Sequence, residues 1–224
     1  MASRKAGRGQ PRVPPSPAEF AKCSPALVTD YPTRWLRLAA RTRPLHDWDD
    51  RAVSRFSHPT HPFRILYLAD EKETAFWEVF GAAIEDMPVD NRAISRKAQV
   101  DPRQWVTYQV PKGLRLVDVT TEATMHALRS NAGTWLAPYK HCQAWAEALM
   151  LHPLKLDGFI YQACRRGETA RCLALFARPT ERIMEVLVPG YIEIILGGHG
   201  PRYPALTDDT DFLRILTKNG IDLR

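Results

Sequence analysis

Four side chains in the first half of the sequence have types suited to holding an anion and stabilising a positive charge: Arg37, Arg55, Tyr67 and Glu78. A guanidinium binds a phosphate group bidentately and keeps its charge, and a tyrosine face can hold a planar ring. A carboxylate stabilises positive charge that develops beside it in a transition state. Taken singly, the two arginines are typical of a protein surface, Tyr67 of a core and Glu78 of a helix face. Their significance therefore depends on the elements that position them.

The segment from residue 64 to 84 predicts a buried strand followed by a helix. Residues 64–69, Arg-Ile-Leu-Tyr-Leu-Ala, form an apolar run that carries Tyr67. Asp70 is expected to cap the helix, with Glu73 three residues later as in a capping box. Glu78 then lies in the second turn, beside an apolar face that includes Ala75 and Val79. A carboxylate beside an apolar helix face is not typical of a charged residue that only keeps the protein surface soluble.

The remaining pattern predicts an α+β fold with mixed, largely antiparallel sheets and flanking helices. Arg37 lies in an expected strand at residues 35–39, and Arg55 in a polar loop at 42–62. Further strand pairs are expected at 105–110 with 114–119, at 159–164 with 172–177, and at 183–187 with 191–196. Helices are expected at 121–129, 139–151 and 210–218. The order contains no βαβ rhythm, which argues against a doubly wound sheet.

Composition indicates one folded domain with an extension. The chain has 224 residues, 45% hydrophobic and 25% charged, which excludes a fibre and a wholly disordered protein. Residues 1–30 are rich in Pro and basic residues and are expected to form a flexible tail, with the domain at 31–224. The tail holds five basic and two acidic residues, so it carries half of the net charge of +6. Direct nucleic-acid binding by the body is therefore not expected.

The four cysteines lie far apart without a Cys-x-x-Cys pair, so free thiols in a reducing cytoplasm are expected. The sequence has no apolar run long enough to span a bilayer, and no membrane association is expected.

Several weaker motifs have ordinary explanations. His58 and His61, and His46 near three aspartates, have metal-ligand types but lie in a loop without fixed spacing, so no metal site is expected. Glycines around His199 lack the Gly-Lys-Ser/Thr ending of a phosphate-binding loop. The tryptophans near the helices are more typical of core than of base stacking.

The segment from Arg55 to Phe80, with Arg-Ile-Leu-Tyr-Leu-Ala-Asp-Glu-Lys-Glu-Thr-Ala-Phe-Trp-Glu-Val-Phe at its end, resembles the core of RES-domain toxins. A second block follows in the family's order: Gln-Ala-Trp-Ala-Glu at 143–147, Asp-Gly-Phe-Ile-Tyr at 157–161 and Leu-Ala-Leu-Phe at 173–176. The resemblance spans about residues 35–178.

This resemblance implies a fold similar to ADP-ribosyltransferases and an enzyme that acts on NAD+ as substrate, with no separate cofactor. Glu78 resembles the family's essential glutamate and Arg37 and Arg55 its dinucleotide-binding arginines, while Tyr67 resembles the aromatic wall of the pocket. The position of the family's serine is occupied by Ala163. Cys164 follows it and, in a strand, is expected on the opposite face. Either the activity is weakened or altered, or the serine's position is displaced by one residue, and Ser57 or Thr169 is a candidate substitute.

The resemblance further implies a type II toxin that cleaves the nicotinamide–ribose bond by hydrolysis or phosphorolysis, with inorganic phosphate as a second substrate in the latter case. A cognate helix-turn-helix antitoxin is the implied protein partner. One alternative is a protein mono-ADP-ribosyltransferase. A second, from another class, is a basic nucleic-acid-binding module without catalysis.

Overall fold

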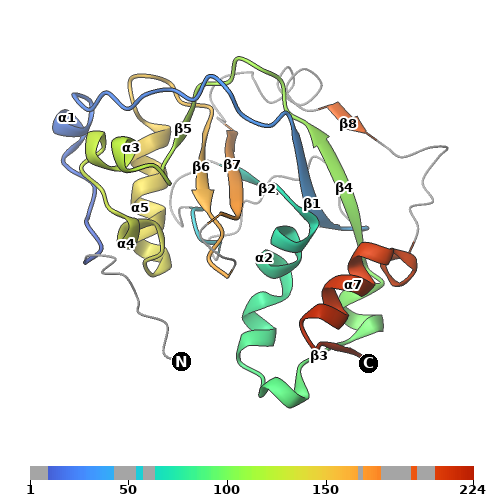
Figure 1. Ribbon diagram of the computed structural model, residues 1–224. Helices are drawn as coiled ribbons and strands as arrows, with labels where there is room; N and C mark the ends of the chain where they lie inside the picture. The colour runs from blue at the N-terminus through green and yellow to red at the C-terminus, as the bar shows by residue number, and fades with distance from the viewer. Residues whose placement is uncertain (1–9, 43–53, 58–63, 166–168, 178–192, 196–204) are drawn as a thin grey trace.

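The computed structural model describes residues 10–42, 54–57, 64–165, 169–177, 193–195 and 205–224 (Figure 1). Its strands are β1 (Arg34–Ala40), β2 (Arg64–Ala69), β3 (Ala93–Ile94), β4 (Arg103–Gln109), β5 (Leu116–Asp118), β6 (Gly158–Gln162), β7 (Arg171–Ala177), β8 (Glu193–Ile195) and β9 (Asp222–Leu223). Its α-helices are α1 (Pro17–Phe20), α2 (Lys72–Glu85), α3 (Glu122–Ala127), α4 (Ala132–Trp135), α5 (Tyr139–Met150) and α7 (Thr210–Lys218). Short helical turns lie at Val89–Asn91, Arg96–Val100 and Leu206–Asp208.

Seven of these strands form one sheet, in the order β5-β6-β7-β2-β1-β4-β8. The β5–β6 pair is parallel and the other neighbours in this sheet are antiparallel. Helices α3, α4 and α5 lie near the β5 end, and α2 and α7 lie beside β1 and β4 (Figure 1). The predicted α+β class with a mixed, largely antiparallel sheet is confirmed.

The sheet divides between β1 and β2. These two strands share one registered pair, Leu36 with Ala69, whereas β1 and β4 pair along seven residues from Arg34 to Ala40. The group β5-β6-β7-β2 and the group β1-β4-β8 are thus joined over a short stretch and leave room between them beyond it.

Strands in the centre of the sheet are buried on both faces. In β7, Cys172, Ala174 and Phe176 belong to one hydrophobic cluster, while Leu173 and Leu175 belong to a second on the other face. The two-residue alternation of strand side chains sends successive residues to opposite faces. This explains why β2 and β7 have unbroken apolar sequences.

The predicted pairing of 105–110 with 114–119 is wrong. β4 instead pairs with β1 and β8, and β5 pairs in parallel with β6, so the two segments lie in different halves of the sheet. The predicted pair of β6 with β7 is confirmed. Of the third predicted pair, residues 183–187 lie outside the described residues.

Helix α2 begins differently from the prediction. Its N-cap residue is Glu71, with no side-chain cap hydrogen bond, and Asp70 instead accepts a hydrogen bond from the Arg171 backbone N–H at 2.7 Å. Lys72 in the first turn forms ion pairs with Asp209 at 2.8 Å and Asp211 at 3.1 Å, which join α2 to the start of α7. Asp70 therefore ties β2 to β7, and the helix is positioned by α7 rather than by a capping box.

Residues 10–30 pack against the domain, unlike the flexible tail that the sequence predicts; residues 1–9 lie outside the described residues. Phe20 is buried, with its ring edge-on to Trp145 and His152 at centroid distances of 5.7 and 5.2 Å. The Trp145 indole N–H donates to the Arg12 carbonyl at 2.7 Å. Composition does not predict this packing, because it cannot show that Phe20 and Cys23 are buried or that Arg12 accepts a hydrogen bond from Trp145.

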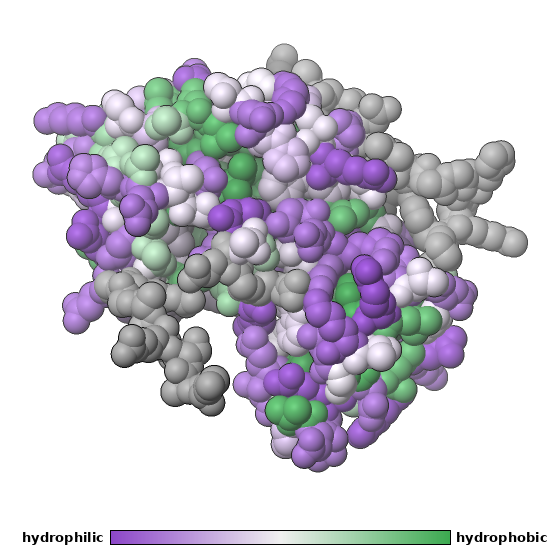
Figure 2. Space-filling model, in the orientation of Figure 1, coloured by the Kyte–Doolittle hydropathy of each residue, from purple (hydrophilic) through white to green (hydrophobic). Residues whose placement is uncertain are grey.

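Most of the face seen in Figure 2 is hydrophilic, and its hydrophobic side chains appear in separate groups. Over the part of the chain that the structure describes, none of the helices has the length and apolar character needed to cross a membrane.

Candidate functional site

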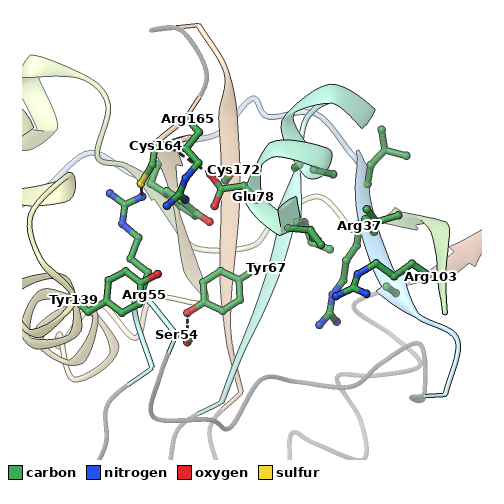
Figure 3. A pocket seen from close by; sticks show the side chains of 18 of the residues that line it. Arg37, Ser54, Arg55, Tyr67, Glu78, Arg103, Tyr139, Cys164, Arg165 and Cys172 are labelled. Carbon is green, nitrogen blue, oxygen red and sulfur yellow. Dashed lines mark hydrogen bonds between the residues drawn. The ribbon is translucent and has the colours of Figure 1, made fainter. Parts of the chain in front are cut away.

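A cleft of about 760 Å³ lies where the two parts of the sheet separate. It is lined by residues of β1, β2, α2, β4, β6 and β7, by the segment 54–57, by the turn after β6 and by the start of α5 with the residues before it (Figure 3). The cleft brings together four of the five side chains singled out in the sequence: Arg37, Arg55, Tyr67 and Glu78. The fifth, Ala163, is not among its lining residues.

Glu78 is half-buried and projects from α2 into the cleft (Figure 3). Its Oε1 accepts a hydrogen bond from the Cys164 backbone N–H at 3.3 Å. Burial raises the pKa of the Glu78 carboxyl above its ordinary value, and the charges of Arg55 and Arg165 together with the Cys164 N–H oppose that rise. The carboxylate is therefore partly desolvated and fixed in direction, as a group that stabilises charge should be.

Arg55 is 8% exposed and lies at one end of the cleft, with Glu78 between it and Arg37 in Figure 3. Its guanidinium stacks over the rings of Phe56 and Tyr161 at 5.1 and 5.6 Å, and its Nη1 donates to the Cys164 thiol. The buried Nη2 has no hydrogen-bond partner. Arg55 is thus a desolvated cation held by aromatic faces close to the carboxylate.

Tyr67 presents its ring to the cleft from β2, and its hydroxyl holds the loop that carries Arg55. The Tyr67 hydroxyl lies 2.9 Å from the Ser54 hydroxyl and accepts a hydrogen bond from the Phe56 N–H at 3.2 Å. Gln143 of α5 donates to the Ser54 carbonyl at 3.0 Å. The short segment 54–57 is therefore anchored from two sides, which fixes Arg55.

Arg37 lines the cleft on the β1 side, away from Arg55. It shares this end with Arg103, the first residue of β4, and the two guanidinium groups project into the same region (Figure 3). The two arginines that the resemblance assigns to the dinucleotide thus occupy different ends of the cleft, with Glu78 and Tyr67 between them in this view.

The prediction that Ala163 contributes to the substrate site is not supported by its position. Ala163 is 1% exposed and belongs to the same core cluster as Phe159 and Tyr161. Its N–H still bonds to the Ala170 carbonyl at 3.1 Å, so the alternation of β6 continues through it. The next residue, Cys164, leaves the strand direction and lines the cleft beside Arg55 and Glu78.

The surroundings of Cys164 disfavour the thiolate form of its side chain. Desolvation raises the pKa of the Cys164 thiol above its ordinary value, and the nearby charge of Arg55 opposes the shift only in part. A thiol reacts through its thiolate, which such a shift disfavours. Cys164 is therefore a polar neighbour of Arg55 and Glu78. Of the two proposed serine substitutes, Ser57 is buried next to Ser54 and does not line the cleft, and Thr169 does not line it either.

Sequence reasoning missed several lining residues, among them Ser54, Arg103, Tyr139 and Arg165. Arg165 forms an ion pair with Glu85 at 2.9 Å, and its aliphatic stem lies where a Cβ on Gly81 would be. Glycine at this point of α2 is needed for that close approach. Only the pairing of β1 with β4 identifies Arg103, and the sequence pattern assigns β4 a different partner.

The metal-ligand types around His46, His58 and His61 and the glycines around His199 lie outside the described residues. Within the described ranges, no group of three or more potential ligands is arranged to hold a metal ion.

A comparison with curated proteins found no match. A family model for the RES domain matches residues 29–196, which is three quarters of the chain and extends beyond the region that the sequence blocks indicated. The RES domain is a toxin-like domain associated with NAD+. Because this match covers well over half of the chain, the protein belongs to the RES domain family, and the matched range includes every described residue that lines the cleft.

Proposed function

We propose that the protein degrades NAD+ by cleaving the bond between nicotinamide and ribose. The observation that carries this proposal is the Glu78 carboxylate, half-buried in a cleft between cationic side chains and fixed by the Cys164 N–H. RES family membership supports NAD+ as the substrate class.

The reaction suits one fixed carboxylate. As the ribose C1′–nitrogen bond breaks, its electron pair moves to the pyridinium nitrogen, so nicotinamide leaves as a neutral molecule and needs no acid. The ribose acquires positive charge in an oxocarbenium-like transition state. Glu78 stabilises that charge from within the partly desolvated cleft. A nucleophilic oxygen then bonds to C1′, and when that nucleophile is water its proton passes to solvent.

The cleft has room for a ligand of this size, since cofactor sites commonly occupy about 300 to 1,000 Å³. Tyr67 provides a face for a planar ring, and the arginines provide donors for phosphate oxygens. Water and inorganic phosphate are the proposed acceptors of the ribosyl group.

Product analysis tests this proposal. The purified protein is incubated with NAD+, with and without inorganic phosphate and a cell extract, and products are identified by mass spectrometry. We expect nicotinamide in every reaction, with ADP-ribose in water or its 1″-phosphate when phosphate is the acceptor. Transfer of a mass increment to extract proteins, without free ADP-ribose, would establish the mono-ADP-ribosyltransferase alternative. No loss of NAD+ in any reaction, with salt-sensitive binding of DNA or RNA, would favour the nucleic-acid-binding alternative.

We also propose that a cognate helix-turn-helix antitoxin binds the protein and blocks the cleft, as the family's association with toxin-antitoxin systems suggests. Expression should then arrest growth and deplete NAD+, and co-expression of the antitoxin should relieve both effects. Expression at a high level without either effect would contradict the proposal.

A further inference from the structure

The end of the cleft opposite Arg55 holds a second arginine that neither the motifs nor the family resemblance identifies. Arg103 starts β4, and register places it opposite Ala40 of β1. Its guanidinium and that of Arg37 project into the same end of the cleft (Figure 3).

The Arg103 side chain is held in place by neutral groups. Its Nη1 donates to the Gln99 carbonyl at 3.0 Å, and its Cζ lies 5.4 Å from the centre of the Phe80 ring. A carbonyl and an aromatic face orient the guanidinium but supply no negative charge. The remaining donors of the planar fork are available to a ligand.

The charge of Arg103 is not neutralised within the protein as described. Arg165, at the other end, is paired with Glu85, and Lys72 is paired with two aspartates. For Arg103, no ion pair with a carboxylate exists among the described residues. Consistently, partial burial alone lowers the pKa of the Arg103 guanidinium, without the opposing effect of a carboxylate.

Partial desolvation of a fixed cation costs free energy unless an anion approaches it. Two guanidinium forks at one end of a cleft suit a diphosphate, which offers acceptor oxygens on two adjacent phosphorus atoms. We propose that Arg103, together with Arg37, binds the diphosphate of the dinucleotide and so makes the enzyme select NAD+ over phosphate-free nicotinamide ribosides. This inference rests on the proposed function and specifies the substrate-binding subsite of that cleft.

The proposal also gives the arginines of the cleft different roles. Arg37 and Arg103 bind phosphate, whereas Arg55, stacked on Phe56 and Tyr161 beside Glu78, tunes the carboxylate. Arg103 is accordingly a binding residue, and its loss should affect the affinity for phosphate-bearing ligands more than the bond-breaking step.

The test compares wild-type protein with Arg103→Gln, Arg103→Lys and the control Arg115→Gln. Arg115 is exposed and does not line the cleft. Initial rates are measured with NAD+ in phosphate-free buffer and with nicotinamide riboside, which has the same scissile bond without phosphate. Thermal unfolding verifies that each variant is folded.

We expect Arg103→Gln to raise KM for NAD+ by about 10- to 100-fold, as the loss of a charge-assisted hydrogen bond does, while kcat changes by less than about threefold. Turnover of nicotinamide riboside should stay the same. Arg103→Lys should give an intermediate KM, because it keeps the charge and loses the fork. Arg115→Gln should match wild type.

An unchanged KM for NAD+, or an equal loss with both substrates, would overturn the assignment. The assignment would also be overturned if Arg103→Gln changed only how the rate depends on added inorganic phosphate. Arg103 would then bind the phosphate acceptor and not the diphosphate of NAD+. Calorimetric binding of ADP-ribose separates this inference from the proposed function. If wild-type protein does not turn over NAD+, the proposed function fails, and weaker ADP-ribose binding by Arg103→Gln still supports the subsite. Equal ADP-ribose affinity in the two proteins would refute it.

Discussion

Replacement of Glu78 by glutamine removes one negative charge and little else. Glutamine has nearly the same shape, and its carbonyl oxygen can still accept the Cys164 N–H that Glu78 accepts at 3.3 Å. At about 4 Å and an effective dielectric constant of about 20, a carboxylate attracts a unit positive charge by about 4 kcal/mol. Since about 1.4 kcal/mol corresponds to a tenfold change in rate, Glu78→Gln should lower kcat/KM by about a thousandfold.

The assay is the initial rate of nicotinamide release from NAD+ by wild-type protein, Glu78→Gln and the control Glu122→Gln. Glu122 is an exposed residue at the start of α3, outside the cleft. The control should match wild type, and thermal unfolding should show all three proteins folded. A folded Glu78→Gln variant with kcat/KM within tenfold of wild type would refute the electrostatic role of this carboxylate.

Three further outcomes follow from the site and one from the core. Burial raises the pKa of Glu78, so protonation removes its charge at a higher pH than for a solvated glutamate. The acidic limb of the pH profile of kcat/KM should therefore lie above the ordinary glutamate range. A limb at or below that range would contradict this expectation. Cys164→Ala should lower kcat/KM by about three- to tenfold through loss of the contact with Arg55, whereas Cys164→Ser should retain most activity; equal rates for the two would exclude a role for that contact. Gly81→Ala should keep the fold, because alanine is more favourable than glycine in a helix by up to about 1 kcal/mol. It should still lower kcat/KM by about tenfold, because the added Cβ displaces the Arg165 side chain. An unchanged rate would show that Arg165 is dispensable. Phe20→Ala should lower the free energy of unfolding by about 3 kcal/mol in denaturant titrations, and unchanged stability would show that α1 does not contribute to the core.

Local sequence patterns predicted the elements better than their pairing. The run at residues 64–69 predicts β2 because both of its faces are buried, and residues 210–218 predict α7 within the observed bounds. The segments around Pro111 and Gly113 look like a hairpin, but hairpin signals do not state which strand lies next to which. One partner of β4 is β1, more than sixty residues earlier, and no local pattern encodes that contact.

The sequence predicted those residues of the candidate site that can be identified by their residue type and by the family resemblance. Glu78, Arg37, Arg55 and Tyr67 all line the cleft, in agreement with the resemblance. Ala163 does not, because it follows the end of β6 with its side chain in the core, and Cys164, in the turn after it, lines the cleft instead.

Arg103 shows the complementary limit of sequence reasoning. As a single arginine at the start of a strand, it is indistinguishable in sequence from a surface residue. Its environment is formed by β1, β4 and Phe80 of α2. These belong to three different parts of the chain.

The charged side chains of the cleft connect these observations to the proposed substrate. Among the described residues that line it are four arginines, Arg37, Arg55, Arg103 and Arg165, and two glutamates, Glu78 and Glu85. Arg165 is paired with Glu85, and Arg55 lies close to Glu78. Under the proposed function, a diphosphate bound at the Arg37 and Arg103 end would meet cationic groups without approaching Glu78. The carboxylate would then remain free to act on the positive charge that develops on the ribose, which explains why a cationic cleft can serve a reaction with a cationic transition state.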